Sequence, residues 1–508
     1  MGRQEEMIKE RIKKLELLRK DGINPYPNKF NFKDYACNLQ EAHKSLKKEG
    51  KSKVKATIAG RLMSFRDLGK IAFGTLRDST GDIQIMLQSP ESNKKIFEFF
   101  KKYVDSGDFL GISGTLFRTK RGELSVIVSK ATLLSKSLLP LPEKWHGLQD
   151  EEERYRKRYI DLITNSSVSN VFKKRALILK TMRNFMDEKG FLEVETPLLQ
   201  KVYGGALAKP FKTHIDAYDS DVFLSIAPEL PLKKALVGGL GNVYEITKKF
   251  RNEGVDRSHN PEHMTIEWYQ EYADYNDGMS LFKELIQKIC KELFGSYKFE
   301  YQGNKIDVSK WTVLPLDKAI KKYLNEDVSK IKTTEDAKKI AEKHNIPSDE
   351  ITTSNIQDEL MKLFREKLIQ PTFLTDYPLE SSPLAKPKSS NPEKAEVFQP
   401  FIAGLELARA YSELNDPKLQ DEHFKEQESE RDTGNTEAMP TDSDFVTALE
   451  HGMPPACGVG IGIERVVMLF TDNTSIRDVI LFPFMKPLSS EKGKDNSSKD
   501  NSNVKGGK

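Results

Sequence analysis

The sequence predicts an α+β protein in two parts, a small N-terminal β-barrel and a large mixed domain of helices and strands. Three observations indicate this. The chain has 508 residues, which is too long for one hydrophobic core. The apolar pattern changes from helical spacing to strand-like alternation near residue 53. Helical and strand patterns then mix from about residue 169 to residue 486.

The composition is typical of a soluble globular protein, with 37% hydrophobic and 31% charged residues. It excludes a disordered chain, and no run of about 18 apolar residues could span a bilayer, so no membrane partner is expected. The N-terminus lacks an apolar signal segment, so secretion is not expected. Cys37, Cys290 and Cys457 lie far apart, which argues against disulfides and a cysteine zinc site. These features predict a cytoplasmic protein.

The first 53 residues form a predicted basic helical arm. They carry 14 Lys and Arg against 8 Asp and Glu, a balance of +6, whereas the whole chain has +4. Residues 4–20 have the apolar spacing of an amphipathic helix that ends at Asp21 and Gly22. A basic arm is what a protein that meets RNA would carry. A solvated helix with surplus lysines explains the charge equally well.

Residues 54–137 predict the barrel. Alternating, β-branched segments are interrupted by turn signals at residues 67–70 and 79–82. Further strands are expected at 108–118 and 123–133, with a helix at 91–104 between the two groups. This order of elements is that of an OB-fold, which commonly binds oligonucleotides. A generic small barrel is the alternative that element order leaves open.

The rest of the chain predicts a linker at residues 138–168 and one large domain at 169–486. Its first elements are a long helix at 167–189 and a strand at 191–200 that ends at Pro197. Strands are expected at 242–247 and 263–272, and a helical insertion at about 277–365. Residues 487–508 have no aromatic side chain and predict a disordered tail.

Two segments carry residues suited to holding a nucleotide, although the chain has neither a P-loop nor a GxGxxG turn after a strand. GVGIGIER at 458–465 reads as a flat strand approached by a planar group, and it leads into a helix that starts near Arg465. A glycine-rich strand packed under a helix is the alternative. In the second segment, 248–269, a strand-loop-strand gathers a guanidinium, carboxylates and an imidazole, which can clamp a triphosphate. Its polar residues are Arg251, Glu253, His259, Glu267 and Tyr269. Surface charge pairing is the alternative there.

Together these segments resemble the three signature motifs of class II aminoacyl-tRNA synthetases. The first motif is the long helix and strand ending at Pro197, and the second is the F-R-x-E segment at 250–253. The third is the glycine strand with Glu464 and Arg465. The chain is most similar to the lysyl-tRNA synthetase family, over residues 5–486. The supporting segments include RYRKRYIDLI (154–163), GGALAKPF (204–211), IAPEL (226–230), HNPE (259–262), YSELNDP (411–417) and IRDVILFP (476–483).

The resemblance implies a catalytic domain built on an antiparallel sheet flanked by helices. It implies an enzyme that joins L-lysine to ATP, releases pyrophosphate, and transfers the lysyl group to the 3′ end of tRNA(Lys). It also implies Mg²⁺ as a cofactor and a homodimer formed through the first motif. The activation step is an in-line attack on the α-phosphate, for which the protein supplies orientation and charge stabilisation.

The resemblance assigns the phosphate side of the site to two arginines and their neighbours. Arg251 is expected to hold the α-phosphate and the lysine carboxylate, and Arg465 to lie near the γ-phosphate or adenine. Glu253 and His259 are expected to fix ATP. Glu406 is expected to help hold Mg²⁺, which bridges phosphate oxygens.

The same resemblance assigns lysine recognition to carboxylates at depth. Glu229 and the turn at Gly204 and Gly205 are expected to take the α-amino group. The ε-ammonium is expected at Glu267 and Glu413, and the ring pair Tyr269 and Tyr411 should frame the alkyl chain. Each carboxylate could instead pair with a neighbouring cation. Because two empty buried carboxylates repel each other, a cation of the right length relieves both.

The barrel is expected to read the anticodon. By resemblance, Phe73 stacks on a base, Arg66 and Gln84 contact the anticodon, and Arg61 joins them. Stacking of this kind contributes about 1–3 kcal/mol per base. Each of these residues, taken alone, could belong to the core or the surface of the barrel.

Three site positions depart from the family pattern. Arg409 stands where Asn is usual, and it is expected to turn to a nearby carboxylate rather than oppose the substrate ammonium. Gln399 replaces a metal-binding Glu, which should weaken one Mg²⁺ site. His263 replaces a Phe that stacks on adenine, and imidazole can still stack there. These departures leave two alternatives, a paralogue that activates another amino acid and an inactive RNA-binding homologue.

Overall fold

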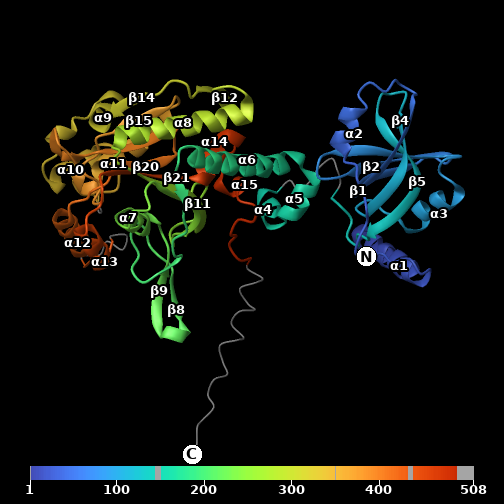
Figure 1. Ribbon diagram of the computed structural model, residues 1–508, viewed down its shortest axis with the longest axis horizontal. Coiled ribbons are helices and arrows are strands. Elements are labelled where there is room, and N and C mark those ends of the chain that lie inside the picture. The colour runs from blue at the N-terminus through green and yellow to red at the C-terminus, as the bar shows by residue number, and fades with distance from the viewer. Residues whose placement is uncertain (1, 143–149, 349–350, 433–438, 489–508) are drawn as a thin grey trace, which may run out of the picture. The chain divides into compact units, whose positions relative to one another are not determined.

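The computed structural model describes residues 2–142, 150–348, 351–432 and 439–488, and the chain divides into two compact units, residues 1–149 and 150–508 (Figure 1). The elements of the first unit follow the predicted order. They are α1 (Arg3–Lys20), α2 (Ala36–Ala42), β1 (Lys51–Asp67), β2 (Ile71–Arg77), β3 (Asp82–Gln88), α3 (Lys94–Tyr103), β4 (Phe109–Arg118) and β5 (Leu124–Ser135).

The five strands of the first unit form a closed barrel in the order β1-β2-β3-β5-β4. Strand β2 shows why, because its side chains alternate between the buried core and the outer face along all seven residues. The helix between the strand groups begins after Asn93, whose side chain accepts a hydrogen bond from the backbone N–H of Ile96. The OB-type barrel expected from the sequence is therefore confirmed.

The N-terminal helix is packed onto this barrel rather than separate from it. Leu18 lies fully buried in the barrel core, and Arg11 is 5% exposed. The Arg11 guanidinium donates to the backbone oxygens of Ser106 at 2.8 Å and Leu139 at 3.1 Å. Because these contacts join both ends of the unit, the boundary expected at residue 53 does not separate two bodies.

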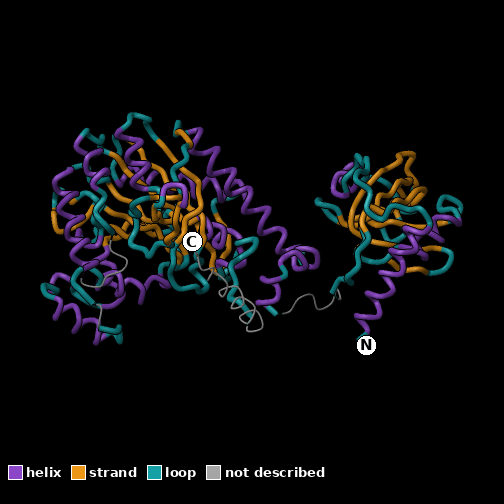
Figure 2. The backbone as a smooth tube through the Cα atoms, turned by 90° about the horizontal axis from the view of Figure 1, so that it is seen from below, coloured by secondary structure: helices purple, strands orange, loops and turns teal. Residues whose placement is uncertain are grey.

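The second unit contains a large mixed sheet in the order β14-β15-β18-β20-β21-β11-β10-β6, with β19 paired to β18. Figure 2 shows its strands enclosed between helices. The sheet strands are β6 (Leu192–Glu193), β10 (Val243–Phe250), β11 (Glu262–Glu271), β14 (Thr312–Pro315), β15 (Thr372–Thr375), β18 (Val397–Ile402), β19 (Leu405–Glu406), β20 (Ala408–Ser412) and β21 (Ala456–Gly462). Three smaller sheets contain β7 (Leu199–Gln200), β8 (Lys212–Ile215), β9 (Ser220–Leu224), β12 (Lys298–Tyr301), β13 (Asn304–Asp307), β16 (Pro387–Lys388) and β17 (Asn391–Ala395).

Helices of the second unit cover the sheet and extend from its edges. The α-helices are α4 (Glu151–Arg156), α5 (Arg158–Thr164), α6 (Ser166–Glu188), α7 (Glu229–Val237), α8 (Tyr275–Phe294), α9 (Leu316–Leu324), α10 (Thr334–Lys343), α11 (Ile356–Phe364), α12 (Pro417–Asp432), α13 (Ser443–Glu450), α14 (Ile463–Thr471) and α15 (Ile476–Val479). Short 3-10 helices lie at Asp216–Tyr218, Val328–Lys330, Arg365–Lys367 and Leu379–Ser381. No helix among the described residues is both long enough and apolar enough to cross a membrane.

The central strands present two different faces. Ile266 and Trp268 on β11, together with Val459 and Ile461 on β21, point into a core shared with α6, α8 and α14. The alternate residues of both strands point to the opposite face, where α7 packs beside β10 and β11. That second face is the floor of the site described below.

The predicted strand at 191–200 is wrong in its extent. Only two short pieces are strands, and they belong to different sheets, since β6 pairs with β10 and β7 pairs with β9. Between them the backbone leaves the ladder, and the N–H of Thr196 donates to the Glu245 carboxylate at 3.1 Å. Pro197 follows directly and has no N–H to offer a sheet.

The predicted linker and insertion also differ from the structure. Helices α4 and α5 occupy the second half of the linker, where Arg158 donates to the backbone oxygen of Arg477 at 2.8 Å and so joins the larger unit. Helix α8 starts the supposed insertion, yet its apolar face is part of the main core. Helices α9, α10 and α11 pack into a second hydrophobic cluster, which they share with Leu374 on β15 and Val397 on β18. The predicted tail lies outside the described residues beyond residue 488.

Candidate active site

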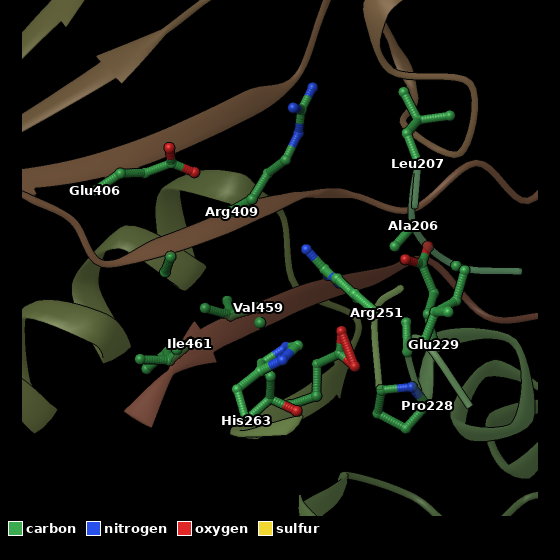
Figure 3. A pocket seen from close by; sticks show the side chains of 18 of the residues that line it. Ala206, Leu207, Pro228, Glu229, Arg251, His263, Glu406, Arg409, Val459 and Ile461 are labelled. Carbon is green, nitrogen blue, oxygen red and sulfur yellow. The ribbon is translucent and has the colours of Figure 1, made fainter. Parts of the chain in front are cut away.

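The site is a cavity of about 360 Å³ on the face of the main sheet opposite α8 (Figure 3). Its floor follows from strand register. Glu267 and Tyr269 on β11 pair with Gly460 and Gly458 on β21, and those glycines pair in turn with Arg409 and Tyr411 on β20. Side chains from the two flanking strands, β11 and β20, therefore converge above two residues of β21 that have none.

The glycines are required by what lies against them. A methyl group built on Gly460 would lie 2.9 Å from Glu267 Oε1, and one on Gly458 would overlap both Glu413 Oε1 and the ring of Tyr269. The wall opposite has the same property, because a methyl on Gly205 would lie 2.7 Å from the Cβ of Glu229. Gly205 also has φ +83°, a conformation that favours glycine.

One end of the cavity is closed by buried acids around a buried lysine. Glu229 and Glu413 are 2% and 1% exposed, and Lys233 is fully buried. The Lys233 ammonium lies 2.6 Å from Glu229 Oε1 and also forms an ion pair with Glu413. Tyr411 donates its hydroxyl to Glu229 at 2.5 Å. Glu229 and Lys233 are one turn apart on α7, so the helix itself sets their pairing.

Electrostatics at this end follow from burial and close charges. Burial raises the pKa of Glu413 well above its usual range, and Lys233 opposes that shift. For Lys233 itself, burial lowers the pKa but Glu229 and Glu413 outweigh it, so the pKa is raised and the ammonium is charged.

Glu267 lies nearer the middle of the floor. Burial, and then the proximity of Glu229, raise the pKa of Glu267 to about 8, against the opposing charges of Lys249 and Arg251. Its Oε2 atom is buried and has no hydrogen-bond partner in the described part of the chain. An unpartnered buried carboxylate oxygen is costly unless a ligand cation or donor reaches it.

The opposite end of the cavity gathers cations. Arg251 follows the last residue of β10, and its Nε atom is buried without a hydrogen-bond partner among the described residues. Burial lowers the pKa of Arg251, but an arginine stays charged. His263 lies beside it, as Figure 3 shows. Burial, followed by the charges of Arg251 and Arg465, lowers the pKa of His263 to about 3, so its ring is neutral at pH 7.

Arg465, Glu406, Glu253 and His259 complete this end of the cavity. Arg465 donates to the backbone oxygen of Glu406 at 2.9 Å, and its Nη1 lies 3.8 Å from that residue's carboxylate. Glu253 accepts from the backbone N–H of Lys209 at 3.3 Å, and His259 lies 2.9 Å from an Asp256 carboxylate oxygen. The structure thus brings together around one cavity all the residues predicted to bind ATP or lysine except Gly204.

Gln399, predicted as a metal ligand, does not line this cavity. It is 3% exposed and accepts a hydrogen bond from the hydroxyl of Tyr377 at 2.5 Å. The described residues contain no cluster of three His, Cys, Asp or Glu that could hold a metal ion. Glu406 remains as a carboxylate facing the cationic end, which fits Mg²⁺ because that ion is often held by one or two carboxylates plus substrate phosphates.

The expectation that Arg409 turns to a carboxylate is wrong. Its Nη2 donates to the backbone oxygen of Ser381 and the hydroxyl of Ser382, both at 2.9 Å. Figure 3 shows its guanidinium directed away from Glu229. Burial raises the pKa of Asp358 on α11, and the charge of Arg409 opposes that shift without forming an ion pair in the described part of the chain. Arg409 therefore lines the cavity without facing the acidic end.

The structure also adds two residues to the site, Lys233 and Lys249. Lys249 is fully buried on β10 and donates to the hydroxyl of Ser225 at 3.1 Å. Burial lowers the pKa of Lys249, and the nearby carboxylates of Glu245 and Glu267 oppose that shift. The ion pair between Glu229 and Lys233 could have been expected from the sequence, because residues four apart on a helix lie side by side. No pattern in the sequence indicates that Lys249 faces inward.

In the barrel, three of the four predicted anticodon residues, Arg66, Phe73 and Gln84, share one outer face. Arg66 pairs across the strands with Phe73, and Gln84 pairs with Thr75, two residues further along β2. Phe73 is half-buried and lies outside the core, whereas Arg66 is exposed. Arg61 is engaged internally, since it donates to the backbone oxygen of Gly107 at 2.9 Å and stacks 4.2 Å from the Phe109 ring centre.

Comparison with known proteins agrees with this geometry. Residues 150–486 match the tRNA synthetases class II (D, K and N), and residues 56–134 match the OB-fold nucleic acid binding domain. A lysine–tRNA ligase of Pelotomaculum thermopropionicum is 47% identical over 96% of both chains. Those of Clostridium novyi and Carboxydothermus hydrogenoformans are each 46% identical over 95% of this chain and 94% and 98% of their own. The chain therefore belongs to the class II tRNA synthetases of the D, K and N group, and within it to the lysine–tRNA ligase family.

Proposed function

We propose that this chain is a lysine–tRNA ligase that activates L-lysine with ATP and then charges tRNA(Lys). The observation that supports this best is the polarity of one cavity. Buried acids close one end and the guanidinium groups of Arg251 and Arg465 occupy the other, on a floor kept flat by Gly458 and Gly460. That arrangement fits a substrate with an ammonium at one end and anionic groups at the other.

Strand register supports a direction for the bound lysine. Along β11 the floor runs from His263, beside Arg251, through Glu267 to Tyr269, beside Glu413. Thr265 lies between His263 and Glu267 on this floor, and neighbouring floor residues, which are two apart in sequence, are about 6.8 Å apart. A lysine whose carboxylate meets Arg251 then has its α-ammonium near Glu267 and its ε-ammonium near Glu229 and Glu413. This exchanges the roles expected for Glu229 and Glu267.

The first step needs no nucleophile from the protein. A carboxylate oxygen of lysine attacks the α-phosphorus of ATP, and the bond to the bridging oxygen of pyrophosphate breaks. Arg251 would hold the lysine carboxylate and the α-phosphate together, where its charge stabilises the transition state. Arg465 would contact the outer phosphates, and the neutral ring of His263 would stack on adenine.

Glu406 would help to hold Mg²⁺, which would supply positive charge beside the leaving pyrophosphate. Gln399 is proposed to have no part in this, because it is bonded to Tyr377. In the second step, a ribose hydroxyl of the terminal adenosine of tRNA attacks the lysyl carbonyl, and AMP leaves. The barrel face with Arg66, Phe73 and Gln84 would bind the anticodon, with Arg61 shaping that face by its stacking on Phe109.

The homodimer is part of the proposal, although the reason for it changes. The apolar face of α6 is covered within the chain, because Ile178, Met182 and Phe185 are buried in the main core. Exposed leucines on the first motif support a partner instead. Leu192, Leu198 and Leu199 are 49%, 39% and 48% exposed. Light scattering should give twice the chain mass of 57.9 kDa, and a monomer would refute this point.

The deciding experiment is ATP–pyrophosphate exchange with each of the twenty amino acids. Exchange with lysine alone, followed by charging of tRNA(Lys), is the expected result. Exchange with a different amino acid would identify a paralogue of changed specificity. No exchange with any amino acid would identify an inactive RNA-binding homologue.

A further inference from the structure

Lys233 is a buried cation that the steps above do not use. It lies behind the cavity wall, while the two acids that it contacts, Glu229 and Glu413, line the cavity. Its ammonium also lies 5.4 Å from the ring centre of Tyr411 and 5.9 Å from that of Phe445 on α13. The lysine side chain is thus enclosed by two acids and two rings.

The position of Lys233 between two acids sets their orientation. Glu229 comes from the first turn of α7, whereas Glu413 follows β20, so different elements carry the two carboxylates. Without a cation between them, two buried carboxylates repel and one takes up a proton. Other ionisable groups of the acidic end are Glu267 and Tyr269 on β11, Tyr411 on β20 and Cys457 on β21. Among all of these, Lys233 is the cation with a direct contact to the pair.

The charges of this end balance only when Lys233 is counted. Glu229, Glu413 and Glu267 carry three negative charges when ionised, and Lys233 reduces the total to two. A bound lysine brings two ammonium groups, and its carboxylate is matched by Arg251. Lysine therefore neutralises the acidic end completely, whereas an amino acid with a single ammonium leaves one buried charge without a partner.

We propose that Lys233 is a positioning residue for lysine selection. Its ammonium holds the carboxylates of Glu229 and Glu413 side by side and favours their ionised forms, so that both face the substrate ε-ammonium. This rests on the proposed function, because it names how that site selects its substrate. Lys233 makes no contact with the reacting atoms, so its loss should affect lysine binding more than the chemical step.

The test compares pyrophosphate exchange by the wild type, K233M and K233Q from pH 6 to 9. K234M is the matched control, because Lys234 is the adjacent residue on α7 and pairs with Asp444 at the surface. We expect the lysine KM of K233M to rise at least about tenfold at pH 7, with the ATP KM unchanged. The acid limb of kcat/KM for lysine should move up by about one pH unit or more. K234M should match the wild type.

Each outcome decides between the two proposals. If the wild type does not exchange with lysine, the proposed function itself fails. If it does, and a folded K233M or K233Q keeps the wild-type KM and pH profile, Lys233 has no positioning role. K233Q keeps a hydrogen-bond donor, so it replaces K233M in the test if K233M does not unfold cooperatively and is therefore not folded. If neither variant folds, Lys233 is a structural residue and the inference is wrong.

Discussion

The two ends of the cavity are built on opposite principles. At the acidic end, a resident cation already pairs with Glu229 and Glu413, and Tyr411 bonds to Glu229. At the cationic end, Arg251 leaves a buried Nε atom without a hydrogen bond within the described chain. At the acidic end a resident cation sets the positions of Glu229 and Glu413 before the substrate arrives, whereas Arg251 at the cationic end keeps a buried donor for the ligand. Selection and catalysis therefore have different structural requirements.

The largest effect should come from Arg251 at the cationic end. Arg251→Ala removes the guanidinium that meets the developing charge, so pyrophosphate exchange should fall by about 10²–10³-fold in kcat. Arg257→Ala, at an exposed position of the same loop, should stay near wild type and serves as the control. A loss of less than tenfold in Arg251→Ala would show that the cationic end does not carry the chemistry.

A smaller loss, of a different kind, is expected at the acidic end. Glu413→Gln leaves Lys233 with one acid and removes a charge facing the substrate, so kcat/KM for lysine should fall by about a hundredfold. The loss should appear mainly in the lysine KM, measured by exchange at several lysine concentrations. Glu393→Gln, on an exposed strand, is the matched control. An equal fall in kcat would contradict the division of labour between the ends.

A barrel substitution should leave both ends untouched. Phe73→Ala removes the ring proposed to stack on an anticodon base, worth about 1–3 kcal/mol. The KM for tRNA should therefore rise by roughly ten- to a hundredfold in aminoacylation assays, while lysine-dependent exchange is unchanged. Phe32→Ala, an exposed ring elsewhere in the unit, controls for general effects. Unchanged tRNA charging would remove Phe73 from the proposed interface.

The pH dependence of lysine binding should report on Glu267. With a pKa of about 8, this carboxyl is mostly protonated at pH 7 in the empty site, and only its ionised form attracts an ammonium. Lysine affinity should rise from pH 6 towards pH 8, by no more than about tenfold per unit. Calorimetry in buffers of different ionisation enthalpy should show close to one proton released at pH 7. Glu267→Gln should bind lysine more weakly and release none from this position.

The smallest effect is expected at Arg409. Its guanidinium bonds to Ser381 and Ser382 rather than to an acid of the cavity. Arg409→Asn should therefore keep kcat/KM for lysine within about threefold of the wild type, or improve it slightly. Exchange assays over a range of lysine concentrations would measure this. A loss beyond tenfold would mean that Arg409 is required at the boundary between the two ends.

Much of the site could be predicted because its residues lie in short, local patterns. Gly458 and Gly460 belong to one strand, so their spacing already places them on a common face, whereas Arg251 and Glu253 lie together in the loop directly after β10. The barrel could be predicted from the alternation of apolar and polar residues and from the turn signals between strands, and β2 has this alternation in the structure. Motif resemblance then supplied the partners of these segments. In each case, the decisive geometry spans only a few residues of backbone.

Where the prediction failed, the deciding contacts join residues far apart in sequence. The pairing of Lys233 with Glu413 spans α7 and the end of β20, and the direction of Arg409 depends on a loop at 381–382. Gln399 lies outside the cavity, where its side-chain oxygen accepts a hydrogen bond from the hydroxyl of Tyr377. Sequence by itself determined which chemical groups the site contains and on which strands they lie. Only the tertiary structure decided which buried charges pair, because that depends on distance and burial rather than on spacing along the chain.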